Sequence, residues 1–378
     1  MHPPSSSTSS SERNRKALAI RETTTIALWF AIFIAIFELV VWFTFAHTPL
    51  RDGSLHTYFW HGQSYEGKIR ALARTPNPPP RSLIFAGWIN ESVLQDKPTD
   101  VDVTVYGSSF AGNVATAMKE LRPQLRLRFL GAPGAPLNHT YGLYELDRTL
   151  RKTRVAVIGV VSETVGQVLT MNIGSIFPEL VMPYFYPRYD LANDRIKRTG
   201  ESLVNSSDTF VHGIDDPGLW KRQLDILSVH DDAYRRLFFA ADPLDRSAVA
   251  RLVRRGLAKS HTDRYLDGIY NRDGYNRDAY AVRVFRALLA RMIDDLREEN
   301  VKPIVVLFAT NGYDDHLHKL LAGLLSERKV PYVNTFDICP STDRRSFIPD
   351  GHFTLQCDLK TATRALELTD VALHGMDR

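Results

Sequence analysis

Cysteine is scarce in this sequence, and no motif has metal-ligand spacing. Among 378 residues there are two cysteines, Cys339 and Cys357, and no C-x-x-C pair. The sequence therefore gives no support for a structural zinc site. The histidines are dispersed except for His316 and His318, whose two-residue spacing at the start of a predicted helix turns their rings in different directions. We expect neither a metal nor a cofactor.

Clustered charge of one sign is also missing. The formal net charge is +4, from 47 Lys and Arg against 43 Asp and Glu, and the arginines are scattered along the chain. A nucleic-acid-binding protein gathers its positive charge on one face. We therefore expect no nucleic-acid partner. The composition, 44% hydrophobic and 24% charged, is that of a globular chain with ample core.

One long apolar run is present near the N-terminus. Residues 25–46, TIALWFAIFIAIFELVVWFTFA, contain only Thr25, Glu38 and Thr44 as polar residues. At about 1.5 Å per residue the run is long enough to cross a hydrocarbon core of roughly 30 Å. It is longer than the apolar region of a secretory signal and has no convincing cleavage site. We predict a transmembrane helix over residues 23–46, with membrane contact through residues 24–46.

The residues that flank this run indicate its orientation. Four basic residues precede the run, whereas the segment HTPLRDG after it carries one arginine and one aspartate. The positive-inside rule then predicts a single-pass protein of a bacterial inner membrane, with a cytoplasmic N-terminus and a periplasmic C-terminal domain. Residues 1–22 are predicted to be a disordered cytoplasmic tail, and residues 47–99 a juxtamembrane connector. Glu38 either is protonated or snorkels, or it contacts another membrane helix.

From residue 100 onward, short apolar runs alternate with helical patterns. Strands are predicted at residues 101–107, 125–134, 154–163, 302–310 and 331–336. Helices are predicted at residues 110–123, 141–152, 280–300, 316–329 and 359–376. This alternation is typical of an α/β fold, a three-layer αβα sandwich with a parallel sheet. The interval 165–280 breaks the rhythm, and we interpret it as an insertion over one end of the sheet.

The stretch VYGSSFAG places two serines where the first strand gives way to a helix. A serine there can point into the crevice at the carboxyl edge of the sheet, where backbone N–H groups of the helix start can stabilise an oxyanion. The spacing G-x-S-x-x-G differs from the G-x-S-x-G elbow of α/β-hydrolases. By itself the motif fits a nucleophile, Ser109, or a structural turn equally well.

A second polar motif, FIPDGHFTLQC, precedes the last helix and contains Asp350 and His352. A serine nucleophile needs a base, and the base needs a carboxylate that fixes its tautomer. Loops often contain such pairs without any catalytic role. The position after the last strand, on the edge where Ser109 is expected, favours His352 as general base and Asp350 as its orienting carboxylate.

Together these motifs resemble the SGNH, or GDSL-type, hydrolase superfamily over residues 100–372. VYGSSFAG is similar to the first block, with Ser109 at the nucleophile, and FLGAPGAP is similar to the second, in which Gly131 would donate a backbone N–H to the oxyanion. PDGHFT is similar to the last block. Its two-residue Asp-to-His spacing also looks like the polysaccharide O-acetyltransferase branch of that superfamily.

The chain departs from the family pattern at the third block, where an Asn normally supplies another oxyanion donor. Here Ser162 and Glu163 stand in VAVIGVVSETV. Loss of one such donor can cost about 10²–10³ in rate. Either Ser162 or a residue of the insertion replaces the Asn, or activity is weak or absent. Asn311, in FATNGYDD, is a further candidate for substrate binding, with a plain turn residue as the alternative.

The resemblance implies serine-dependent acyl-ester chemistry. We expect O-acetyl transfer to, or deacetylation of, a cell-surface or exported polysaccharide, and the acyl donor could come from a membrane-bound partner. The alternatives are a lipid-directed esterase or lysophospholipase, and a catalytically degenerate glycan-binding or scaffold protein. The aromatic stretch PYFYPRY either stacks on sugar rings or forms core. Cys339 and Cys357 are either bridged in an oxidising compartment or free and buried.

Overall fold

The computed structural model describes residues 9–46, 59–74, 87–94, 100–150 and 152–374. The chain divides into two compact units. The first unit comprises Met1–Gln63 and Asp242–Leu257, and the second comprises Ser64–Ala241 and Ala258–Arg378. The second unit contains the sheet and the two motifs that carry Ser109 and His352. Each unit is described by itself below.

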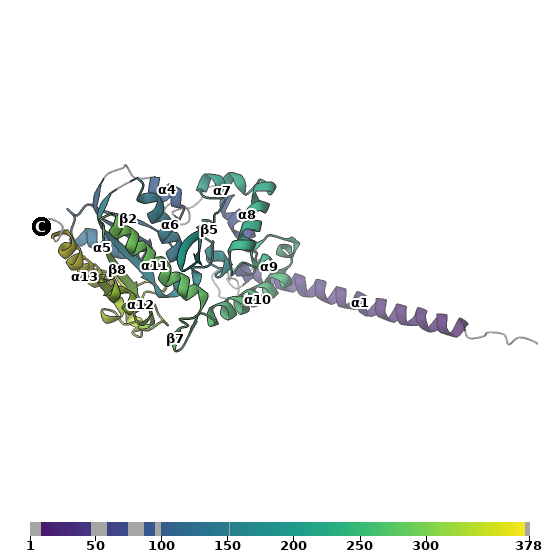
Figure 1. Cartoon of the computed structure of the whole chain (residues 1–378). Helices are drawn as coiled ribbons and strands as arrows, with labels where there is room; N and C mark the ends of the chain where they lie inside the picture. Colours follow the sequence, from purple (N-terminus) through teal and green to yellow (C-terminus); the bar gives the residue numbers. More distant parts are fainter. Residues whose placement is uncertain (1–8, 47–58, 75–86, 95–99, 151, 375–378) are drawn as a thin grey trace, which may run out of the picture. The chain divides into compact units, whose positions relative to one another are not determined.

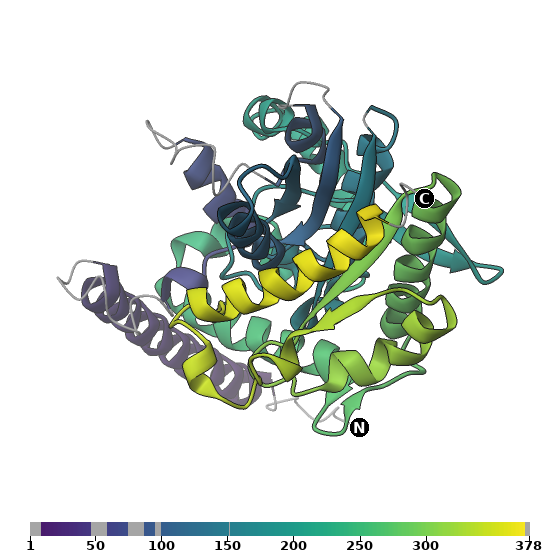
Figure 2. The ribbon, with the colours of Figure 1, turned by 90° about the vertical axis from the view of Figure 1, so that its left-hand side faces the viewer.

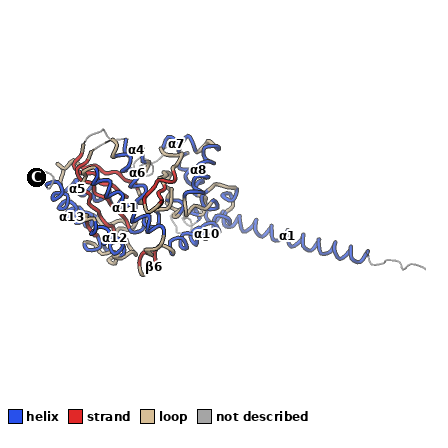
Figure 3. Tube along the Cα trace, viewed as in Figure 1, coloured by secondary structure: helices blue, strands red, loops and turns tan. Residues whose placement is uncertain are grey.

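A five-stranded parallel sheet, in the order β2-β1-β3-β8-β9, forms the centre of the second unit (Figures 1 and 3). The strands are β1 Val101–Ser108, β2 Leu127–Ala132, β3 Thr153–Val161, β8 Lys302–Phe308 and β9 Tyr332–Asn334. The interior strands β3 and β8 are nearly continuous apolar runs because both of their faces are covered. All five predicted strands are present, which confirms the predicted α/β class.

Helices cover both faces of the sheet and make three layers (Figure 2). On one face lie α5 (Ser109–Leu121) and α13 (Leu355–His374), which contact each other. On the other face lie α6 (Leu137–Asp147), α11 (Tyr280–Glu298) and α12 (His316–Glu327). In α11 the buried residues recur at helical spacing, so one stripe of the helix faces the core. The predicted αβα sandwich is thus confirmed.

The region between β3 and α11 interrupts the sheet, as expected of the predicted insertion. Its elements are η1 Ser162–Gln167, η2 Ile173–Ser175, β4 Arg188–Ala192, β5 Arg195–Gly200, α7 Ser207–Gly213, α8 Pro217–His230, α9 Arg236–Phe239, η3 Pro243–Arg246, α10 Ala248–Asp267, β6 Tyr270–Asn271 and β7 Gly274–Tyr275. Two short turns, η4 Thr335–Asp337 and η5 Arg344–Ser346, lie after β9. The stretch PYFYPRY is core, because Tyr184, Phe185 and Tyr186 are each at most 3% exposed. Its rings are therefore not available for stacking on sugars.

The described parts of the predicted connector are folded. Within residues 47–99 the structure contains α3 (Tyr65–Ala73) and α4 (Ile89–Leu94). Tyr65, Ile69 and Trp88 are fully buried in a core that they share with the insertion. The connector prediction is wrong for these helices, because large aromatic side chains gain most from burial and draw the segment into the domain. Residues 47–58, 75–86 and 95–99 lie outside the described residues.

The first unit contains the long helix α1, Ser9–Ala46. Within it, residues 15–44 are long and apolar enough to cross a membrane, by length and composition. The helix begins at Ser9, so the prediction of a disordered tail over residues 1–22 is wrong from that residue onward. No glycine or proline occurs between Ser9 and Ala46, and several strong helix formers precede the apolar run. Residues 1–8 lie outside the described residues.

Candidate active site

The turn from β1 into α5 requires glycine at position 107. Gly107 has a φ of +152°, and a Cβ there would lie 2.8 Å from the Cβ of Ala111 and 2.9 Å from the carbonyl oxygen of Gly159. A side chain would therefore push the strand and helix apart. Ser108 is buried as the N-cap residue, and Ser109 becomes the first residue of α5. The small residues thus serve the turn and also expose one hydroxyl at the strand end.

Ser109 and His352 meet although 243 positions separate them in the sequence. The Ser109 Oγ lies 2.7 Å from the His352 Nε2. The imidazole ring stacks on Phe110, with ring centroids 4.7 Å apart and an interplanar angle of 26°. Phe110 itself packs against Phe308 and Phe353. Core aromatic residues next to Ser109 thus fix the orientation of the His352 ring.

Asp350 contacts the other side of the His352 imidazole. Its Oδ1 lies 3.2 Å from Nδ1 and also accepts the backbone N–H of His352 at 3.0 Å. The backbone N–H lowers the pKa of the Asp350 carboxyl, and the His352 side chain adds to this effect. The side chain of Asp350 is 62% exposed. The three residues form a Ser–His–Asp chain whose carboxylate lies in water, unlike the buried carboxylate of a serine protease.

A disulfide and two backbone contacts hold the loop that carries Asp350 and His352. Cys339 and Cys357 are bridged, with Cα atoms 6.0 Å apart. Phe347 pairs with Phe353 in an antiparallel bridge, and the Ile348 N–H donates to the His352 carbonyl at 2.8 Å. The free-thiol alternative therefore does not apply. The disulfide closes the chain around the loop that carries Asp350 and His352 and restricts its motion.

The two predicted oxyanion donors lie at neighbouring strand ends. The Ser109 N–H belongs to the first turn of the 13-residue helix α5, where backbone N–H groups have no partner within the helix. Gly131 lies on β2, one residue before the end of the strand, and pairs in register with Gly107 of β1. Both residues are thus at the carboxyl edge of the sheet. Their role as oxyanion donors stays a prediction.

Ser162 is occupied by a structural contact. Its Oγ donates to the Phe308 carbonyl at 2.8 Å, and the residue is 1% exposed. Its own carbonyl accepts the Tyr275 hydroxyl at 2.8 Å. The side chain ties the end of β3 to the end of β8, so its single hydroxyl proton is not directed at a substrate. The structure gives no support for the predicted oxyanion role of Ser162.

Glu163, the next residue, introduces a carboxylate near His352. Glu163 is partly accessible to solvent. Protein atoms around its carboxylate nevertheless remove much of the bound water, and this desolvation raises the pKa of Glu163. The nearby positive charge of His352 lowers that pKa in part. Two carboxylates, Asp350 and Glu163, thus act on the imidazole. Sequence reasoning treated Glu163 only as a departure from the family pattern.

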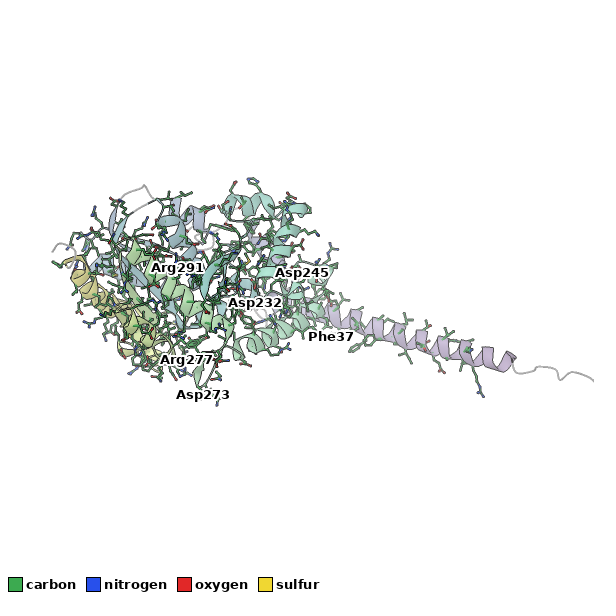
Figure 4. All side chains as sticks on the ribbon, viewed as in Figure 1. Phe37, Asp232, Asp245, Asp273, Arg277 and Arg291 are labelled. Carbon is green, nitrogen blue, oxygen red and sulfur yellow. A yellow bond between two sulfur atoms is a disulfide. The ribbon has the colours of Figure 1, made fainter. Side chains whose placement is uncertain are left out.

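Three tyrosines form a partly exposed aromatic cluster next to Ser162 and Glu163. Tyr270 and Tyr275 come from the β6–β7 hairpin, and Tyr313 follows β8. The Tyr270 ring centroid lies 4.9 Å from that of Tyr275 and 4.5 Å from that of Tyr313. Figure 4 labels Asp273 and Arg277 at this hairpin. We call the three residues the tyrosine cluster.

Sequence reasoning missed the tyrosine cluster, although its signal was present. The stretch YNRDGY carries two of the tyrosines on either side of a turn. The Tyr270 hydroxyl donates to the Gly312 carbonyl at 2.9 Å, which fixes the hairpin against the loop after β8. Asn311 lies in this same loop, as an exposed turn residue two positions before Tyr313. Its predicted role in substrate binding stays a prediction.

Comparisons with known proteins give remote similarities only. No protein-family model matches the chain, and no curated protein matches it. Among solved structures, a candidate acylhydrolase from Bacteroides fragilis is 9% identical, with a TM-score of 0.38 and coverage of 76% of this chain and 95% of the other. A candidate lipolytic protein of the G-D-S-L family from Desulfitobacterium hafniense is 8% identical, with a TM-score of 0.33 and coverage of 71% and 99%.

A third similar structure is a GDSL-like lipase from Bacteroides thetaiotaomicron. It is 8% identical, with a TM-score of 0.36 and coverage of 82% of this chain and 98% of the other. These similarities are too remote to indicate the chemistry of the site, which has to be inferred from the geometry of its residues.

Proposed function

We propose that this protein carries out acyl-ester chemistry through an acyl-enzyme at Ser109. The observation that carries the proposal is the 2.7 Å contact between the Ser109 Oγ and the His352 Nε2. His352 takes the hydroxyl proton as Oγ attacks the ester carbonyl carbon, and the resulting oxyanion lies at the start of α5. When the intermediate collapses, the C–O bond to the leaving alcohol breaks, and His352 returns the proton to that oxygen.

The second half of the reaction decides the type of enzyme. A sugar hydroxyl that attacks the acyl-serine makes the protein an O-acetyltransferase, whereas water makes it an esterase. His352 removes the proton from either nucleophile and gives it back to the Ser109 Oγ as the acyl group leaves. The same two side chains thus serve both reactions, and the acceptor that reaches them determines the product.

The proposed substrate is a polysaccharide at the cell surface or on its way out of the cell, either as the acceptor of an acetyl group or as the acetyl ester that is cleaved. The tyrosine cluster supports this class, because partly exposed aromatic rings suit the C–H faces of sugars. The disulfide between Cys339 and Cys357 supports an oxidising compartment such as the periplasm. The apolar helix α1, with its basic N-terminal flank, supports an inner-membrane anchor. A membrane-bound acyl donor would fit this location.

The first test compares two adjacent serines in the full chain, purified in detergent. Ser109→Ala should abolish turnover of p-nitrophenyl acetate and labelling by a fluorophosphonate. Ser108→Ala is the matched control, because the Ser108 hydroxyl is buried and has no hydrogen-bond partner within the described residues. It should keep most of the activity. Turnover by the Ser109→Ala protein equal to that of the wild type would remove Ser109 from the mechanism.

Acyl-chain length and acceptor then separate the substrate classes. Activity that is highest with acetyl esters and is diverted to an added oligosaccharide supports polysaccharide O-acetyl transfer. Activity that rises with chain length supports a lipid-directed esterase instead, a reading that the membrane-span candidate α1 makes physically reasonable. Glycan binding without fluorophosphonate labelling would indicate a catalytically degenerate protein.

A further inference from the structure

Glu38, the acidic residue in the apolar part of α1, has three hydrogen-bond partners. The Glu38 carboxylate accepts the Ser247 hydroxyl at 3.0 Å and the Val249 N–H at 3.0 Å, and it also accepts the Ala248 N–H. These partners are the first residues of α10 and the residue before it. A carboxylate at the positive end of a helix is stabilised by the unpaired N–H groups there. Glu38 thus caps α10 across the first unit.

Apolar packing surrounds this cap. Val41 of α1 packs with Phe59, Ala248 and Leu252, and the first three are at most 4% exposed. The guanidinium of Arg251 lies over the Phe59 ring, 5.3 Å from its centroid. The cap is therefore part of a small packed core within the first unit. The start of α10 is fixed to α1 at the level of Glu38.

The position of Glu38 along α1 indicates how deep in the membrane its contact with α10 would lie. Glu38 lies eight residues before Ala46, the end of α1 and of the apolar run. At about 1.5 Å per residue that is roughly 12 Å along the helix axis. Interfacial helices lie about 5–10 Å into the boundary between headgroups and acyl chains. If α1 spans the membrane with Ala46 at its outer end, the start of α10 lies about 12 Å below that end, slightly deeper than an interfacial helix and within the outer leaflet.

The surface around the cap suits that depth. Leu244, Val253 and Leu257 are between 46% and 56% exposed. Figure 4 labels Phe37 of α1 and Asp245 in this first unit. Apolar side chains that point into solvent here would contact lipid at the membrane surface.

A groove between α1 and the segment before α10 has an apolar wall and a cationic end. It has a volume of about 650 Å³, and its lining includes Phe30, Ala31, Ala35, Glu38, Arg246 and Ser247. Arg246 is exposed, and no acidic partner for it occurs among the described residues. The charge of Glu38 is balanced by the helix start. Arg246 is therefore the cation that an anionic ligand in this groove would meet.

We propose that this groove binds an anionic phospholipid of the outer leaflet, with an acyl chain along the Phe30–Ala35 side of α1 and the phosphate at Arg246. Glu38 is a positioning residue that holds the Arg246 segment against α1. The inference requires α1 to be a membrane helix and does not depend on the chemistry at Ser109. Fluorophosphonate labelling of Ser109 reports on that chemistry separately.

The experiment measures lipid retention by the full chain in detergent, with native mass spectrometry, after addition of phosphatidylglycerol or phosphatidylcholine. The wild type should retain phosphatidylglycerol more strongly. Arg246→Gln should lower that retention about fivefold, the usual effect of one basic residue near an anionic lipid surface. It should lower retention of phosphatidylcholine less, because the choline ammonium of that lipid offsets the charge of its phosphate. Arg272→Gln, an exposed arginine in the other unit, is the matched control and should match the wild type.

Two further arms separate the acyl and phosphate contacts. Ala31→Trp fills the apolar side of the groove and should lower retention of both lipids. Millimolar inorganic phosphate should not displace phosphatidylglycerol, since phosphate alone lacks the acyl contact. Circular dichroism checks that each variant is folded. Equal retention of the two lipids by the wild type, wild-type retention by Arg246→Gln, or displacement by phosphate would each overturn the proposal.

Discussion

Replacing Asp350 by Asn should lower turnover much less than the corresponding substitution does in serine proteases. In serine proteases, where the carboxylate is buried, the same substitution lowers kcat by about 10⁴. Here the Asp350 side chain is 62% exposed, and its Oδ1 lies 3.2 Å from the His352 Nδ1. Water therefore screens its interaction with the imidazolium that forms in the transition state.

The magnitude follows from this exposure. Ion pairs in water contribute about 0.2–1 kcal/mol. A loss of about 1 kcal/mol in transition-state stabilisation corresponds to roughly a fivefold lower kcat/KM. The Asp350→Asn protein should therefore keep about a fifth of the wild-type activity. Glu163 should supply part of what remains, because its carboxylate also interacts with His352.

The assay is kcat/KM for p-nitrophenyl acetate from pH 5 to 9, for Asp350→Asn, Glu163→Gln and the double variant. If both carboxylates stabilise the imidazolium, the double variant should lose more activity than either single variant. A 10³-fold loss in Asp350→Asn alone would refute the reasoning and indicate a carboxylate enclosed when substrate binds.

Three stability predictions follow from buried groups and from the disulfide. Burial raises the pKa of Asp358 to about 7, so the free energy of unfolding should fall as pH rises from about 4 to 7. The Asp358→Asn substitution should remove this pH dependence. It should also raise the free energy of unfolding by about 2–4 kcal/mol at pH 7.5, as measured by denaturant unfolding. Burial lowers the pKa of His139 to about 4. The contribution of the neutral His139 ring to the free energy of unfolding is therefore complete above about pH 6.5 and is lost as pH falls toward 4. A His139→Gln protein whose stability falls with acid as much as that of the wild type would contradict this prediction. Replacing Cys339 and Cys357, 18 positions apart, by serine should cost about 3 kcal/mol. An unchanged unfolding midpoint would argue against a bridge in the native protein.

Local patterns were sufficient to predict the layers of the domain. In the apolar run of β3 and the amphipathic stretch of α11, the spacing of the hydrophobic residues identifies a strand and a helix, respectively. The type and order of these elements could therefore be predicted from the sequence. The glycine and serines after β1 marked the strand-to-helix turn for the same reason. The predictions failed where neighbours along the chain gave little information. Tyr65 and Trp88 looked like connector residues because the core that buries them is formed by the insertion.

The candidate site shows the same division. The sequence by itself determined that a serine follows β1 and that an Asp-x-His pair precedes the last helix, because both depend on short motifs. Only the tertiary structure decided that the Ser109 and His352 side chains lie 2.7 Å apart, that the Ser162 hydroxyl is used by Phe308, and that Glu38 caps α10. Contacts between distant residues depend on how the whole chain packs, and no local period or spacing encodes them.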